Sequence, residues 1–199
     1  QAVCLAGHLV AVACSGSSSP AAPDAVPASA PPLAQLAKCA TWANTLRATG
    51  VSAATGAVVA QREAFYAAGG GIRAVGSKYY AALFPSTWAS SSPRRVFVDL
   101  HGTGGAPETE WSTDWKDIMN QKGWGYLGLK YVNDSTGVHD TETTIYANVK
   151  TMLTDIAASC DFGNPSMFLV GFSRGSSYTF PIAYLDLNDR RYFAAMGSN

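Results

Sequence analysis

The spacing of apolar and polar positions predicts a series of helices from residue 33 onward. Apolar residues recur at helical spacing over residues 33–48 and again over residues 140–159. An alanine-rich stretch at residues 53–68 gives a weaker helical pattern, which three successive glycines end. We also expect helices over the polar segment at residues 111–121 and from the glycine-rich turn near residue 175 to about Leu187.

Short apolar runs between these segments predict strands. Residues 72–84 have the pattern of a strand pair, and residues 96–100, 125–132 and 167–170 are compact apolar runs. One more strand is expected to begin at residues 192–196. Because strands alternate with helices, we expect an α/β fold with a mostly parallel sheet and right-handed crossovers.

The first 32 residues differ in composition from the rest of the chain. Residues 1–13 are mostly apolar and end in small residues before Cys14, a pattern typical of a signal peptide and similar to a bacterial lipobox. Cys14 would then carry lipid; the alternatives are an ordinary secretory signal or a short buried helix. Residues 14–32 are almost entirely Ser, Ala and Pro, which predicts a flexible tether. We therefore expect an exported protein, at the cell surface, in the periplasm or secreted, whose folded portion is residues 33–199.

Charge and hydropathy limit the expected partners. Fourteen Lys and Arg residues balance 14 Asp and Glu residues, so no net field attracts nucleic acid or anionic lipid. No apolar stretch approaches the roughly 20 residues that cross a bilayer. We expect membrane contact only through a lipid on Cys14, and no metal or cofactor.

A strand-to-helix turn near the C-terminus carries the main candidate for chemistry. The apolar run at residues 167–170 leads directly into Gly171-Phe172-Ser173-Arg174-Gly175. In a G-x-S-x-G turn the serine sits on a strained backbone with its hydroxyl above the sheet edge, and the glycines let strand and helix approach closely. We interpret Ser173 as a nucleophile. The alternative is a glycine-rich turn with an incidental serine, because so short a pattern also arises by chance.

A second motif, His101-Gly102-Thr103-Gly104-Gly105, follows the strand predicted at residues 96–100 and lies about 70 residues before the first. Together the two motifs resemble the α/β-hydrolase superfamily, and within it the secreted serine esterases of the polyhydroxyalkanoate-depolymerase and feruloyl-esterase group. The resemblance covers roughly residues 72–199. It implies an α/β-hydrolase fold, here incomplete, that ends after the strand following the elbow helix.

The resemblance also implies roles for individual residues. The oxyanion hole would consist of the backbone N–H groups of Arg174 and Thr103, with Gly104 as the alternative second donor. His101 would be structural and would steady the loop. Glycines such as Gly102 would let the loop backbone approach the substrate.

The chain contains no histidine after Ser173. In α/β-hydrolases the acid and then the histidine follow the nucleophile. Asp186 and Asp189 are the only acids after Ser173, and they come too early for the family position. His139 lies in a polar loop and is expected to be a solvated surface residue. We therefore expect the catalytic acid and histidine beyond residue 199, a chain truncated at both ends, and little activity from this fragment alone.

Four cysteines are present, of which Cys4 and Cys14 belong to the leader. In an oxidising compartment the remaining pair, Cys39 and Cys160, suggests a disulfide. Two buried free thiols are the alternative.

These features predict a secreted serine hydrolase that cleaves a small-molecule or polymeric carboxylic ester. A serine peptidase on the same fold, or a non-catalytic surface lipoprotein whose scaffold has lost its triad, would show the same motifs. Four aromatic residues either line an acyl or aromatic pocket or pack in the core: Trp111, Trp115, Trp124 and Tyr178.

Overall fold

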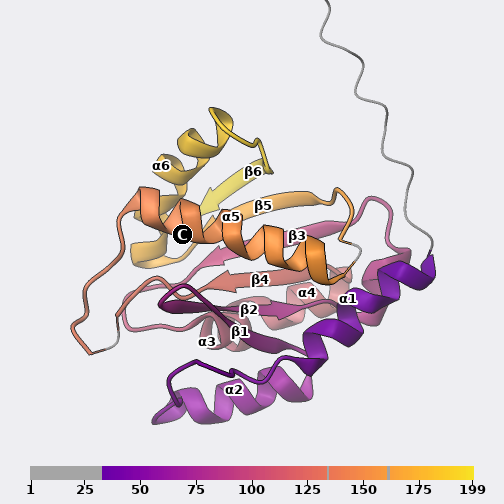
Figure 1. The fold of residues 1–199 in the computed structure, drawn as a ribbon, viewed down its shortest axis with the longest axis horizontal. Helices are drawn as coiled ribbons and strands as arrows, with labels where there is room; N and C mark the ends of the chain where they lie inside the picture. The colour runs from indigo at the N-terminus through magenta and orange to yellow at the C-terminus, as the bar shows by residue number, and fades with distance from the viewer. Residues whose placement is uncertain (1–32, 134, 161) are drawn as a thin grey trace, which may run out of the picture.

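The computed structural model describes residues 33–133, 135–160 and 162–199. The predicted signal peptide, the predicted tether and Cys14 lie outside these described residues. The described chain forms a six-stranded sheet with helices on both faces (Figure 1).

The sheet is mixed, and most of its strands run parallel. Its strand order is β1-β2-β4-β3-β5-β6. Strand β2 runs in the direction opposite to the other five strands. The strands are β1 (Gly71–Val75), β2 (Lys78–Leu83), β3 (Arg95–Leu100), β4 (Gly125–Leu129), β5 (Ser166–Gly171) and β6 (Phe193–Ser198). A two-residue turn joins β1 to β2, and its first residue, Gly76, has a φ of 57°, as a type II′ hairpin turn requires.

The helices connect these strands as the sequence pattern predicts, with one segment divided. The α-helices are α1 (Leu33–Thr45), α2 (Ala57–Ala67), α3 (Pro107–Glu110), α4 (Lys116–Lys122), α5 (Glu142–Ser159) and α6 (Ser176–Leu187). A π-helical turn at Trp111–Trp115 separates α3 from α4, so the segment predicted at residues 111–121 is not one regular helix. Thr141 caps α5 by accepting a hydrogen bond from the Thr144 N–H at 3.3 Å.

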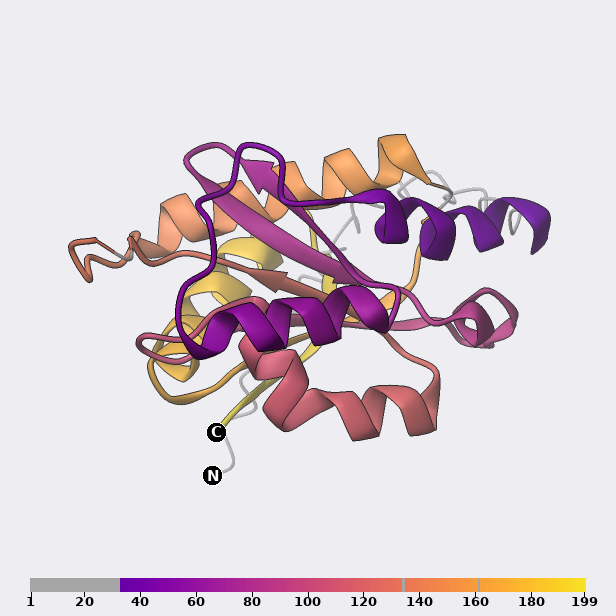
Figure 2. The same ribbon diagram turned by 90° about the horizontal axis from the view of Figure 1, so that it is seen from below.

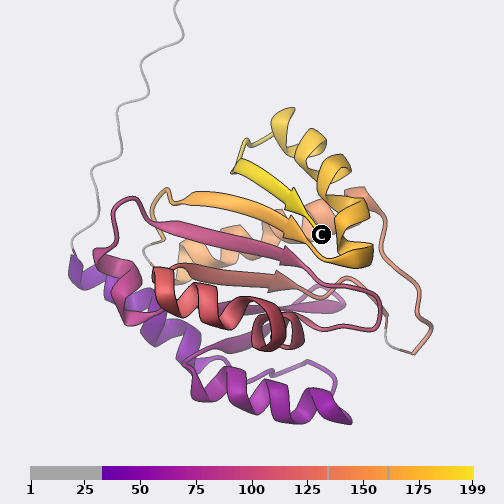
Figure 3. The same ribbon diagram turned by 180° about the vertical axis from the view of Figure 1, so that it is seen from behind.

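Helices cover the two faces of the sheet in two groups. Helices α1, α5 and α6 pack on one face, and α2, α3 and α4 lie on the other (Figures 1 and 3). Figure 2 shows the layers edge-on, with the sheet between α5 and α2. Successive side chains of β2 point to opposite faces of the sheet and contribute to both hydrophobic cores. Tyr80 and Ala82 belong to the core under α5, whereas Tyr79, Ala81 and Leu83 belong to the core under α2.

The predicted fold class is confirmed. The sheet is mostly parallel and helices flank it, as in the α/β-hydrolase fold. Within the described part of the chain, no helix combines the length and apolar character needed to cross a membrane.

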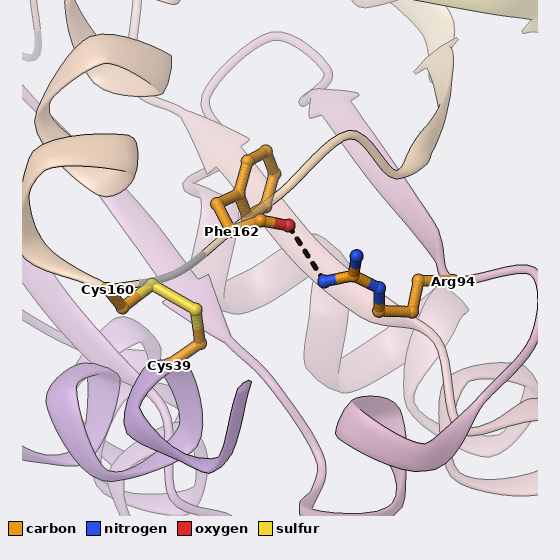
Figure 4. Close-up of a disulfide and its surroundings, with 4 residues drawn as sticks. All are labelled: Cys39, Arg94, Cys160 and Phe162. Atoms are coloured by element: carbon orange, nitrogen blue, oxygen red, sulfur yellow. Dashed lines mark hydrogen bonds between the residues drawn. A yellow bond between two sulfur atoms is a disulfide. The ribbon is translucent and has the colours of Figure 1, made fainter. Parts of the chain in front are cut away.

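A disulfide ties the first helix to the end of the longest one. It joins Cys39 of α1 to Cys160, directly after α5, with 4.9 Å between the Cα atoms (Figure 4). Nearby, the Arg94 guanidinium donates a hydrogen bond to the Phe162 carbonyl at 3.1 Å and so holds the loop that leads into β5. The cross-link encloses most of the sheet, because the two cysteines are 121 residues apart in the chain.

Candidate active site

Ser173 occupies a strained turn between β5 and α6. Strand β5 ends at Gly171, Phe172 is still extended, and Ser173 has a φ of 51°. A non-glycine residue in this left-handed region costs about 1–3 kcal/mol and persists only where the surrounding structure enforces it. The Ser173 side chain is exposed. Ser173 therefore lies exposed on a strained strand-to-helix turn, which is the local geometry that the G-x-S-x-G motif predicts.

The two glycines of the motif allow close packing around this turn. A Cβ on Gly171 would lie 2.5 Å from the carbonyl carbon of Gly175, and a Cβ on Gly175 would collide with the carbonyl oxygen of Leu100. The elbow is also attached to β3, because the Phe172 N–H donates to the Leu100 carbonyl at 3.2 Å. The sequence requirement for glycine here is steric.

The loop after β3 forms a tight turn directly beside the elbow. The Gly105 N–H donates to the Gly102 carbonyl at 3.0 Å, and Gly104 has a φ of 73°, as the third residue of a type II turn requires. Thr103 and Gly104 occupy the exposed centre of this turn, and its closing hydrogen bond uses neither of their N–H groups. A Cβ on Gly102 would lie only 3.4 Å from the Ser173 Cβ. The turn predicted to bind an oxyanion therefore lies against the serine predicted to attack.

The position of this pair in the sheet favours a ligand site. Strands β3 and β5 are adjacent and parallel; β3 leads to α3 on one face of the sheet, whereas β5 leads to α6 on the other. In open α/β sheets, ligands bind in the crevice at such a switch point, outside the carboxyl ends of the strands. The two motifs directly follow β3 and β5 at this edge of the sheet.

The backbone donors at the elbow differ in availability. The Ser173 N–H donates to the Asn199 carbonyl at 2.7 Å. Arg174 is the second residue of the helical turn that begins at Ser173, so its N–H belongs to the first turn and has no acceptor within the helix. Arg174 is thus the residue whose N–H can serve a ligand.

Four side chains contact the Gly102–Gly105 turn or the residue before it and hold the turn in place. The Gly102 N–H donates to Glu110 Oε1 at 2.9 Å, and Lys130 Nζ donates to the Gly105 carbonyl at 2.7 Å. His101 Nδ1 lies 2.7 Å from the Gly102 carbonyl, and the Tyr131 hydroxyl donates to the His101 carbonyl. The His101 ring is fully buried and stacks on Tyr131. These contacts fix the turn at whose exposed centre Thr103 and Gly104 lie.

Glu110 is a site residue that sequence reasoning missed. It is almost fully buried, and this burial raises the pKa of its carboxyl to about 7; the Gly102 N–H opposes the rise, whereas the neighbouring carboxyl of Asp114 adds to it. The segment follows Pro107, a common first residue of helices, but no local pattern indicates that Glu110 points back toward the loop.

Asp99, on β3 next to the loop, is a second buried acid that the sequence does not reveal. Its carboxyl is fully buried, accepts a hydrogen bond from Trp115 Nε1 at 3.2 Å, and lies 2.9 Å from the Tyr126 hydroxyl. That hydroxyl is also 2.7 Å from the Pro107 carbonyl, to which it can give its single proton. A proton on Asp99 would then satisfy the second contact. Burial raises the pKa of Asp99 to about 8, in agreement with this proton count.

His139 is not the solvated surface residue that the sequence suggests. It is half-buried, pairs across a short bridge with Val132, and packs against the rings of Tyr131 and Tyr178. Burial lowers its pKa, and the positive charge of Arg174 lowers the pKa further. The sequence does not reveal this environment, because the residues next to His139 in the chain are polar.

The remaining aromatic and acidic candidates are structural. Trp111 is fully buried against Phe65, and Trp124 stacks on Phe168. Tyr178 is buried and stacks under the Arg174 guanidinium, with 5.5 Å from Cζ to the ring centre. The Trp115 indole N–H donates a hydrogen bond to the Asp99 carboxyl, as described above.

The two acids after Ser173 also have structural partners. Asp186 is buried and accepts hydrogen bonds from the Tyr146 hydroxyl and the Tyr192 N–H, each at 3.0 Å. Asp189 pairs with Lys150. The described residues hold no group of three His, Cys, Asp or Glu side chains with the geometry of a metal site.

A cavity of about 720 Å³ lies on the side of the turn formed by Gly104 and Gly105. Its wall comes from the loop before α2, the start of β2 and the segment after β4. Ser173 and the aromatic candidates are not among its lining residues.

No family model and no curated protein matches this chain. Est1E from Butyrivibrio proteoclasticus, in a structure with ferulic acid bound, is 16% identical, with a TM-score of 0.46 over 63% of this chain and 50% of that one. A cold-adapted esterase from an Arctic intertidal metagenomic library is 14% identical, with a TM-score of 0.47 over 64% and 58% of the two chains. LpqC, a poly(3-hydroxybutyrate) depolymerase from Bordetella parapertussis, is 16% identical, with a TM-score of 0.43 over 60% and 44%.

The chain thus spans about half the length of these solved structures.

Proposed function

We propose that this chain supplies the nucleophile and the oxyanion hole of a serine hydrolase that cleaves carboxylic esters. The observation that supports this most directly is the exposed, left-handed Ser173 in contact with the turn that presents Thr103 and Gly104. A strained serine turn is retained where it has a use, and the adjacent turn adds two backbone N–H groups that its closing hydrogen bond does not use.

In the proposed reaction, Ser173 Oγ attacks the ester carbonyl carbon and its proton passes to a base. The new C–O bond places a negative charge on the carbonyl oxygen, which the N–H groups of Arg174 and Thr103, or Gly104, stabilise. Collapse breaks the bond to the leaving alcohol, which takes up the proton. Water then attacks the acyl-serine by the same route and releases the acid.

The base and its carboxylate partner are proposed to lie after residue 199. Asp186 and Asp189 are engaged with Tyr146 and Lys150 respectively, which supports this assignment. His101 is held beneath the loop, so its contacts are those of a positioning residue. The proposed order of nucleophile, acid and histidine is the one that this fold uses.

The test is covalent labelling of the full-length protein with a fluorophosphonate, together with hydrolysis of p-nitrophenyl acetate. Labelling at Ser173 is expected, and Ser173→Ala is expected to abolish both labelling and hydrolysis. Ser177→Ala, which removes an exposed hydroxyl one helical turn later, is the matched control and should preserve both. Full hydrolysis by Ser173→Ala, or labelling only at another serine, would show that Ser173 is not the nucleophile.

A further inference from the structure

The carboxyl of Glu110 lies close to both ends of the turn that carries Thr103 and Gly104. Glu110 Oε1 accepts a hydrogen bond from the Gly102 N–H at 2.9 Å. The same oxygen would lie only 3.0 Å from a Cβ placed on Gly105, the last residue of the turn. A single oxygen of a buried side chain therefore binds the start of the turn and lies beside its end.

The Gly102 N–H depends on this acceptor. Gly102 is buried, so water does not readily replace a lost partner of its N–H. A buried backbone donor without an acceptor is costly, and the chain moves to avoid that cost. Without the Glu110 carboxyl we expect the turn to shift. Thr103 and Gly104 would move with it, because they directly follow Gly102 in the chain.

Glu110 is one member of a pair of acids. The other is Asp114, which lies one helical turn later in the π-helical segment and forms a side-chain hydrogen bond with Glu110. A hydrogen bond between two carboxyl groups needs a proton, since two carboxylates can only accept. Burial raises the pKa of Glu110 to about 7; the Gly102 N–H opposes this rise and Asp114 adds to it. Glu110 therefore changes its charge near neutral pH.

The two charge states of Glu110 differ in how strongly they bind the turn. The ionised carboxylate accepts the Gly102 N–H in a charge-assisted hydrogen bond, which is roughly twice as strong as a bond between neutral groups. The protonated acid still accepts this N–H, but without the additional strength. Protonation of the acid pair therefore loosens the turn and does not release it.

Titratable side chains of the neighbouring elements also surround the pair and the turn. They are Asp99 of β3, His101 of the loop, Glu108 of α3, Tyr126 of β4, and Lys130 and Tyr131 after β4. Asp114 differs from these groups because it is both exposed and hydrogen-bonded to Glu110. Its charge can therefore be removed without opening the core.

We propose that Glu110 is a positioning residue for ester hydrolysis: its ionised carboxylate fixes the Gly102–Gly105 turn and with it the oxyanion donors, and its protonation beside Asp114 weakens that hold. Glu110 acts through Gly102 and does not contact the substrate. This inference rests on the proposed function for its link to hydrolysis. The hold on the Gly102 N–H is a property of the folded protein and is measured without any reaction.

The first experiment follows the Gly102 amide by NMR in the full-length protein labelled with ¹⁵N-glycine, from pH 5 to pH 9. The Gly102 proton resonance should move downfield as Glu110 ionises, with a midpoint near pH 7. Glu110→Gln should abolish this titration, because its amide accepts from Gly102, donates to Asp114 and so copies the protonated acid. Asp114→Asn should move the midpoint to lower pH. Asp117→Asn, which removes an exposed charge on α4, is the matched control and should leave the midpoint unchanged.

The second experiment measures hydrolysis of p-nitrophenyl acetate by the same full-length variants. Glu110→Ala should lower kcat at pH 8 by at least about tenfold and change KM by less than about threefold, since the oxyanion donors act mainly in the transition state. Glu110→Gln should restore most of the lost kcat, because it keeps the acceptor oxygen. Asp114→Asn should raise kcat at pH 6 by about twofold, because Glu110 then stays ionised at that pH.

A Gly102 resonance that does not titrate, or that titrates equally in Glu110→Gln, would overturn the hold on the turn. A titration through Glu110 combined with unchanged kcat in Glu110→Ala would overturn the positioning role. If Glu110→Ala does not fold, unchanged kcat at pH 6 in Asp114→Asn overturns that role instead. Absence of hydrolysis by the unmutated protein, with Gly102 still titrating through Glu110, would contradict the proposed function and leave the hold on the turn established.

Discussion

Asp99→Asn is expected to stabilise this protein, although it removes a buried and fully hydrogen-bonded carboxyl. Asp99 contacts Trp115 Nε1 and the Tyr126 hydroxyl, and that hydroxyl also reaches the Pro107 carbonyl. The protonated acid satisfies all these contacts. An asparagine amide has the same shape, accepts from Trp115 and donates to Tyr126, so it reproduces the protonated state without needing a proton.

The magnitude follows from the difference between the folded and unfolded pKa values. Burial raises the pKa of Asp99 from 3.8 to about 8 in the folded protein. Because the folded-state pKa is raised, the folded protein favours the protonated carboxyl. The resulting contribution to the unfolding free energy is fully present below pH 3.8 and is lost as the pH rises through about 8. Each pH unit in this window changes the unfolding free energy by about 1.4 kcal/mol. At pH 7 the loss amounts to about 4 kcal/mol, which Asp99→Asn avoids.

The assay is urea unfolding of the unmutated protein and of Asp99→Asn at pH 4, 7 and 9. The two proteins should have similar unfolding free energies at pH 4, and the variant should gain an advantage that grows with pH up to about 8. Asp117→Asn, on the exposed surface of α4, is the control for the loss of one negative charge. If Asp99→Asn lowers stability by the same amount at every pH, Asp99 is not protonated in the folded protein and the proton count at Tyr126 is wrong.

Two further predictions concern the cross-link and the oxyanion turn. Replacing Cys39 and Cys160 together by serine should cost about 5 kcal/mol of unfolding free energy, because the bridge closes a loop of 121 residues; a loss below about 1 kcal/mol in urea unfolding would contradict this. Thr103→Pro should lower kcat/KM by about 10²–10³-fold, since it removes one backbone donor at a turn position where proline is favoured, whereas Thr103→Ala keeps the N–H and should retain activity. Similar losses in both variants would show that the Thr103 side chain, and not its N–H, is what matters.

Much of the fold could be predicted from the sequence because its signals are local. The apolar run of β5 followed by Gly171 and Ser173 predicts a strand, a tight turn and a helix. The steric need for glycine at Gly171 acts within this turn, whereas that at Gly175 comes from Leu100 of β3. Periodicity likewise predicted α5, whose buried residues recur along one face. The family resemblance implied that the two motifs lie together, and in the structure they do so because β3 and β5 are neighbouring parallel strands.

The supporting residues could not be predicted, since their roles depend on contacts between distant segments. Glu110 lies eight residues after Gly102, and its carboxylate reaches the Gly102 N–H because the chain folds back between the loop and α3. His139 was expected to be solvated because its neighbours in sequence are polar, yet the fold packs it on Tyr131 and Tyr178.

The sequence by itself therefore determined the elements, the fold class and the candidate nucleophile, because strand alternation, helical spacing and glycine-dependent turns are written in neighbouring residues. Tertiary structure alone decided which groups hold the turn at Gly102, that burial raises the pKa of Asp99, and that Arg62, Lys78 and Lys130 share one cavity. Burial and electrostatics depend on the surroundings in space, and those surroundings come from segments far apart in the chain.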